Sequence, residues 1–113
     1  MSSGSPGYAL EKLSTAVHSL AVGKGDVRNR LRGAFMSFHP VQESDFPEHL
    51  KAKWRWIKGE LTKFGPIVDD DGKVVDGSVD HTLSRIKNST GRRIAEAIVS
   101  LQSELDSYLR HER

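Results

Sequence analysis

The five histidines are the side chains in this sequence that could do acid–base or metal chemistry near neutral pH. They are His18, His39, His49, His81 and His111. Two imidazoles four residues apart on one helix can share a metal ion, but no pair in this sequence has that spacing. Acidic residues surround His49, and they fit the acidic first turn of a helix, which complements the helix dipole. We therefore predict no metal site.

Other residue combinations suggest catalysis or ligand binding only superficially. The aspartates 69–71 precede Gly72, as in a calcium loop, but Ser78 stands where such a loop needs a glutamate. Asp80 and His81 are residue types used in nucleophilic catalysis, yet no G-x-S-x-G turn accompanies them. The chain has no cysteine and no phosphate-loop spacing. The sequence therefore predicts no catalytic residue, no cofactor and no small-molecule substrate.

A tryptophan beside basic residues is the first feature that indicates binding. The apolar stripe through Trp54 predicts a helix, and Trp56 lies well away from that stripe. One flank of the stripe is basic and carries Lys51, Arg55 and Lys58. Trp56 either packs beneath another segment or is an exposed anchor of the kind enriched at interfaces. We predict that Trp56 is largely exposed and that it binds a protein partner together with the basic flank.

The second feature is the basic joint at residues 83–98. Its pattern G-x-x-x-A-x-x-I, from Gly91 to Ile98, is similar to the second half of a helix-hairpin-helix DNA-binding motif, although Ser89 replaces the motif's first glycine. The resemblance implies that backbone amides at the start of the second helix hold a phosphate, with basic side chains beside them. The candidate nucleic-acid-binding residues are Arg85, Gly91, Arg92, Arg93, Arg28 and Arg32.

Charge and composition rank these two interpretations. The formal net charge is only +2, which is small for a dedicated nucleic-acid-binding protein. The first hypothesis is therefore a non-enzymatic helical interaction module that binds a protein partner or self-associates. The alternative is a DNA- or RNA-backbone-binding protein that uses the joint at 83–98.

Helical periodicity fills most of the chain and sets the expected fold. Apolar residues recur three and four positions apart between breaks formed by glycine, proline and asparagine. Five helices are expected within 8–22, 27–39, 46–64, 79–87 and 92–108. Asp26 is the expected cap of the second helix, Ser44 or Asp45 of the third and Ser78 of the fourth. The sequence therefore predicts an all-α compact bundle.

Residues 66–77 break the helical pattern. Two β-branched pairs flank Asp71-Gly72, a dipeptide suited to a type I′ hairpin turn, and Asp70 would then oppose Lys73. The stretch 65–77 carries one lysine against four aspartates, a net charge of −3. Because a two-stranded hairpin is marginal alone, we expect it to lean on the helices or to remain a loop.

The 113 residues suit one domain, which we place at 8–113, after a flexible Ser/Gly/Pro-rich tail at 1–7. The apolar runs are far too short for a membrane span, and the start of the chain does not match a secretory signal. The lack of cysteine fits a reducing compartment. These features predict a cytoplasmic location without a membrane partner.

Overall fold

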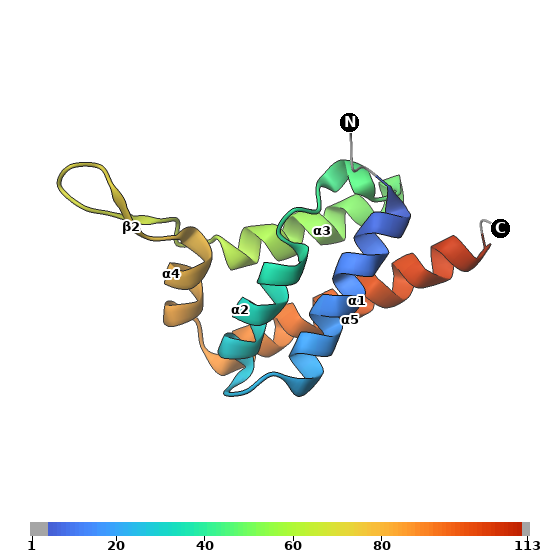
Figure 1. Ribbon diagram of the computed structural model, residues 1–113, viewed down its shortest axis with the longest axis horizontal. Coiled ribbons are helices and arrows are strands. Elements are labelled where there is room, and N and C mark those ends of the chain that lie inside the picture. The colour runs from blue at the N-terminus through green and yellow to red at the C-terminus, as the bar shows by residue number, and fades with distance from the viewer. Residues whose placement is uncertain (1–4, 112–113) are drawn as a thin grey trace.

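The computed structural model describes residues 5–111, and within that range it contains five α-helices and one pair of short strands (Figure 1). The elements in chain order are α1 (Pro6–Val22), α2 (Val27–Phe38), the 3-10 turn η1 (Glu43–Asp45), α3 (Glu48–Leu61), β1 (Ile67–Val68), β2 (Val74–Asp76), α4 (Ser78–Arg85) and α5 (Asn88–His111). The predicted all-α bundle with a hairpin-like excursion at 66–77 is confirmed.

The first two helices begin at side-chain caps. The Ser5 hydroxyl accepts a hydrogen bond of 3.1 Å from the Tyr8 N–H, so α1 starts at Pro6, within the predicted tail. Residues 1–4 of that tail lie outside the described residues. The Asp26 carboxylate accepts from the N–H groups of Arg28 and Asn29, which confirms it as the cap of α2. The hydrogen bond from the Arg28 side chain, followed by the one from the Asn29 N–H, lowers the pKa of Asp26.

The expected caps of the next two helices were wrong. Pro47 precedes α3 and makes no capping bond, while Asp45 ends η1 and accepts a 2.8 Å hydrogen bond from the Gln42 N–H. Ser78 is the first residue of α4, and Gly77 occupies the cap position without a side chain to offer. Local sequence signals placed these helices correctly but assigned their first residues less well.

Residues 88–91 do not interrupt the helices as expected, because they form the first turn of α5. Gly91 is buried there, and a Cβ atom on it would lie 2.9 Å from Val27 Cγ1. Glycine at this position therefore allows α2 to pack closely on α5. Its role is tertiary packing, not helix termination.

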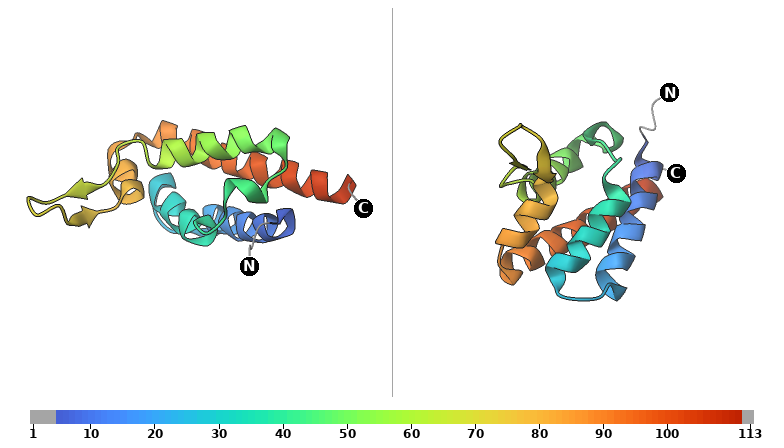
Figure 2. Two further views of the ribbon diagram at one scale, coloured as in Figure 1. Left: turned by 90° about the horizontal axis from the view of Figure 1, so that it is seen from above. Right: turned by 60° about the vertical axis from the view of Figure 1, so that its left-hand side comes forward.

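The apolar stripes of the helices meet in one core. The left view of Figure 2 shows two layers, with α3 and α5 in one and α1 and α2 in the other. Each helix contributes at least one fully or almost fully buried side chain to the core. Examples in chain order from α1 to α5 are Leu13, Leu31, Trp54, Leu83 and Ile98. Within residues 5–111, no helix has the length and apolar character needed to cross a membrane.

The hairpin closes through a different turn from the expected type I′. Gly72 has a φ of 79°, but no described non-glycine residue has a positive φ, which excludes type I′ at Asp71. The Asp69 carbonyl accepts from the Gly72 N–H, and the Asp69 N–H donates to the Lys73 carbonyl, as in a type I turn followed by a glycine bulge. The Asp69 carboxylate accepts from the N–H groups of Asp71 and Lys73. The expected Asp70–Lys73 ion pair does not form within the described residues.

Candidate interaction surface

The basic flank predicted on α3 is largely neutralised by its own chain. Arg55 Nη1 lies 2.6 Å from Glu43 Oε2, and Lys51 Nζ lies 3.9 Å from Glu48 Oε2. The Lys58 ammonium lies 5.7 Å from the centroids of two aromatic rings, a cation–π arrangement. The flank is therefore a set of internally paired side chains, and its positive charge is mostly already engaged.

Trp56 lies at the surface but is not the freely exposed anchor that the sequence suggested. It exposes 39% of its surface and belongs to no buried cluster, whereas Trp54 exposes 3%. Less than half of the Trp56 residue surface is thus accessible to solvent. The prediction that Trp56 lies outside the core is met, and the prediction that it is largely exposed is met only in part.

The basic joint at 83–98 lacks the free backbone amide that the motif resemblance requires at Gly91. The Gly91 N–H donates to the Lys87 carbonyl at 3.0 Å, and the residue is buried. Arg92 and Arg93 are exposed and take part in no ion pair within residues 5–111. The joint therefore keeps its arginines available, but the glycine serves the α2–α5 contact.

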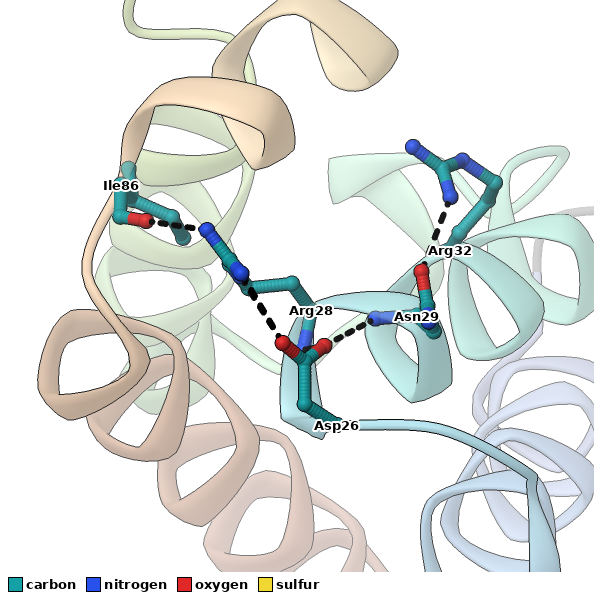
Figure 3. Close-up of polar contacts among 5 residues, drawn as sticks. All are labelled: Asp26, Arg28, Asn29, Arg32 and Ile86. Carbon is teal, nitrogen blue, oxygen red and sulfur yellow. Dashed lines mark hydrogen bonds and ion pairs between the residues drawn. The ribbon is translucent and has the colours of Figure 1, made fainter.

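Arg28 and Arg32 are also held by their own chain (Figure 3). Arg28 Nη2 lies 3.0 Å from Asp26 Oδ2, and its Nη1 donates at 3.2 Å to the Ile86 carbonyl at the end of α4. Arg32 Nε lies 2.6 Å from Asp80 Oδ1. Figure 3 shows the two guanidinium groups directed to different sides of α2. They fasten helices together instead of converging on a common ligand.

A shallow groove of about 560 Å³ runs along α5, with Leu20, Ala95 and Val99 among its lining residues. The Glu104 carboxylate at its edge accepts hydrogen bonds from Lys53 and from the Ser100 hydroxyl, and the Lys53 bond is the main cause of a lowered Glu104 pKa. No group of three or more histidines or carboxylates between residues 5 and 111 is placed to hold a metal ion. The groove thus combines apolar surface with the paired Glu104 and with Arg92 and Glu96, which form no ion pair within residues 5–111.

Exposed apolar side chains lie close together in the segment 66–77, which we call the arm. Figures 1 and 2 show it projecting beyond α4, away from the helices, with β1 and β2 paired to each other. Three of its β-branched side chains are exposed: Ile67 by 39%, Val68 by 54% and Val74 by 55%. The arm forms a hairpin without leaning on the bundle, contrary to expectation. It therefore offers apolar side chains and unpaired strand edges to solvent.

Two side chains of α4 fix the base of the arm. The Phe64 N–H donates to Thr82 Oγ1 at 3.1 Å, and Thr82 is completely buried. His81 Nδ1 lies 2.9 Å from the Gly65 carbonyl, and since a carbonyl only accepts, Nδ1 carries the proton in this bond. The arm consequently leaves the bundle from an anchored base.

The Phe64 side chain completes this base, although the sequence placed it on the buried stripe of the third helix. Because α3 ends at Leu61 and Gly65 adopts a φ of 68°, the Phe64 ring leaves that stripe and is 41% exposed. Its centroid lies 5.9 Å from the His81 ring and 5.0 Å from the Arg85 guanidinium carbon. Arg85, a predicted nucleic-acid contact, thus lies at the base of the arm.

We expect Thr82→Val to loosen the base of the arm. The substitution keeps the shape of the side chain but removes the acceptor of the Phe64 N–H, which should lower the free energy of unfolding by about 1–2 kcal/mol. Chemical denaturation measures this change, and faster amide exchange at Phe64 localises it. Thr62→Val is the control, since its hydroxyl bonds only the Lys58 carbonyl of its own helix, and it should change stability by at most about 0.5 kcal/mol. Equal effects of both substitutions would contradict the role assigned to Thr82.

The fold and this surface together define a small helical bundle that carries an anchored hairpin with exposed apolar side chains. Comparisons with protein-family models, curated proteins and solved structures gave no match.

Proposed function

We propose that this protein is a non-enzymatic interaction module that binds a protein surface through the arm. The observation that supports this most directly is the exposure of Ile67, Val68 and Val74 on a hairpin whose base is anchored to α4. A hairpin of two strands is marginally stable by itself in water. Contact with another protein would cover its apolar side chains and pair its free edges.

Strand edges explain why a protein partner suits the arm. An edge presents a row of unpaired N–H and C=O groups, and many recognition domains bind by adding a strand at such an edge. Within residues 5–111 the arm contains both strands of the only sheet, so neither β1 nor β2 is shielded by a further strand. We further propose that binding occurs in the cytoplasm, since the cysteine-free sequence fits a reducing compartment.

Nucleic-acid binding through the joint at 83–98 stays a prediction. It depends on Arg92 and Arg93, which have no ion-pair partner within the described part of the chain. The engaged Gly91 amide and the paired Arg28 and Arg32 give it less support than the arm gives to protein binding. Protein interaction is therefore the function that these observations favour.

Site-specific photocrosslinking tests the proposed function. A photoreactive amino acid replaces Val68 on the arm in one variant and Val22 at the end of α1 in a control variant. Both side chains are apolar and exposed, Val22 by 63%. After irradiation in cells that produce the chain, we expect a discrete covalent adduct from the Val68 position and much less from the Val22 position, with mass spectrometry identifying the captured protein.

The same experiment also defines the result that opposes the proposal. If the Val68 position yields no adduct above the Val22 control, with another protein or with this chain itself, then the arm is not a binding surface. Circular dichroism of both variants ensures that the comparison is made between folded proteins.

A further inference from the structure

We propose that the end of the bundle where α1, α2 and α5 meet binds an anionic amphiphile, a small molecule with a negatively charged head and an aliphatic chain. The head would lie between Arg30 and Arg92, and the chain would follow the groove along α5. The site shares no residue with the arm, so it does not depend on the proposed function. Its residues come from three helices, which is why helical spacing did not indicate it.

Another cavity, of about 410 Å³, adjoins the groove along α5. Its lining residues lie near the end of α1, at the start of α2 and in the first turns of α5, which are at the same end of the bundle in Figure 1. The cavity and the groove share Leu20, Arg92 and Ala95, so they form one continuous depression. Volumes of this size, lined by apolar side chains and a few polar groups, are typical of small-molecule sites.

Arg30 on α2 supplies one positive charge to this cavity. A Cβ atom at Gly23 would lie 3.1 Å from Arg30 Cγ, so the Arg30 side chain packs against the end of α1. Arg30 is half-buried, and its Nε is buried without a hydrogen-bond partner among residues 5–111. The guanidinium also forms no ion pair in this range. Because an unsatisfied buried donor costs free energy, a bound anion would stabilise Arg30 in this position.

Arg92 on α5 supplies the second positive charge. It lines both the cavity and the groove, and it is exposed without an ion-pair partner in the described part of the chain. Arg30 and Arg92 thus offer two guanidinium groups to one cavity, and guanidinium groups bind the oxygens of carboxylates and phosphates in pairs. Because α5 begins at Asn88, another lining residue, the positive end of its dipole also lies here. An anionic head therefore suits this cavity.

The carboxylates near the two arginines do not neutralise them. Asp26 also lines the cavity, but its carboxylate lies 3.0 Å from Arg28 Nη2 and caps α2. Glu96 lies one turn beyond Arg92 in the groove, and no ion pair joins these two side chains. The cavity therefore keeps the positive charge that a bound anion needs.

The groove offers an apolar path for the aliphatic chain. Leu20, Ala95 and Val99 line it, and Val99 is 44% exposed. From Arg92 to Ser103, α5 rises by about 16 Å, which is long enough for a medium-length alkyl chain laid along the helix. Each CH₂ group that this surface removes from water would favour binding. The depression therefore matches a ligand with one charged end and one apolar end.

Titrations followed by NMR test the proposal with octanoate and octyl phosphate, which carry the same chain on different anionic heads. We expect both to bind and to shift the methyl signals of Leu20 and Val99, and the tighter probe distinguishes a carboxylate head from a phosphate head. Acetate and inorganic phosphate lack the chain, and octanol lacks the charge. Each of these three should therefore bind at least about tenfold more weakly.

Substitutions test the two ends of the site with the tighter probe. Arg30→Gln and Arg92→Gln should each weaken binding at least about tenfold, because each removes one guanidinium group. Arg93→Gln is the matched control, since Arg93 is exposed on α5 but does not line the depression. Val99→Glu places a carboxylate beside the alkyl chain and should also weaken binding, whereas Met36→Glu, at an exposed site on α2, should not. Circular dichroism of each variant verifies that it is folded.

Three results would overturn the proposal. They are the absence of binding by both amphiphiles below the concentrations at which they form micelles, equal binding of octanol, and binding that neither arginine substitution changes. None of these results bears on the arm, because the Val68 photocrosslinker reports on a separate surface. The site and the proposed function can therefore fail independently.

Discussion

Phe38→Ala should lower the free energy of unfolding by about 3–5 kcal/mol. The Phe38 side chain is completely buried, and its ring lies 5.5 Å from the Trp54 ring and 5.6 Å from the Phe35 ring, both at steep angles. Truncation would remove these edge-to-face contacts and leave a cavity between α2 and α3 that a rigid core refills only partly. Chemical denaturation should show a lower midpoint with an unchanged slope.

A second substitution on the same helix provides the control. Met36 is also large and apolar but is 64% exposed, so Met36→Ala should change stability by no more than about 0.5 kcal/mol. If Phe38→Ala cost less than about 1 kcal/mol, the aromatic contact between α2 and α3 would not be central to the fold. The difference between the changes in unfolding free energy of the two variants measures how much burial of a large apolar side chain contributes to stability at the C-terminal end of α2.

Gly91→Val should destabilise the protein by about 1–3 kcal/mol. A Cβ atom at Gly91 would lie 2.9 Å from Val27 Cγ1 and 3.5 Å from Leu31 Cδ1. The branched side chain would therefore force α2 and α5 apart, and the stiff Val27 side chain has little freedom to move aside. Thermal unfolding would record the loss as a lower Tm.

Other helical glycines give the opposite expectation. Nothing lies within 4 Å of a Cβ atom built at Gly33 on α2 or at Gly59 on α3. Gly33→Ala and Gly59→Ala should each stabilise the protein by about 0.5–1 kcal/mol, because alanine restricts the unfolded chain and favours the helix. If Gly91→Val also stabilised the protein, close packing would not be the reason for glycine at position 91.

The candidate surface shows where sequence reasoning reached its limit. The exposed position of Trp56 and the basic residues beside it were visible from helical spacing, but their salt bridges to Glu43 and Glu48 were not. Ion pairing of Arg55 depends on η1 packing beside α3, a contact that periodicity does not encode. The β-branched pairs of the arm were also visible in the sequence. Three of these residues, Ile67, Val68 and Val74, are exposed in the structure.

The sequence by itself determined the helices and the hairpin. Apolar spacing of three and four residues, the Asp26 cap and the glycine–proline breaks act locally, so they can be recognised without knowing what packs where. The same local signals located the hairpin at 66–77 and its negative charge. They also assigned Trp54 to the core, where it exposes only 3% of its surface.

Only the tertiary structure decided how these elements are used. The absence of a side chain at Gly91 allows α2 to pack closely on α5. Arg28 and Arg32 join elements that are distant in the sequence. The arm projects away from the bundle, and His81 and Thr82 hold its base by hydrogen bonds (Figure 1). The physical reason is that burial and charge pairing depend on neighbours brought from elsewhere in the chain. Periodicity reports which face of a helix is apolar, but it does not report which side chains a partner element leaves uncovered.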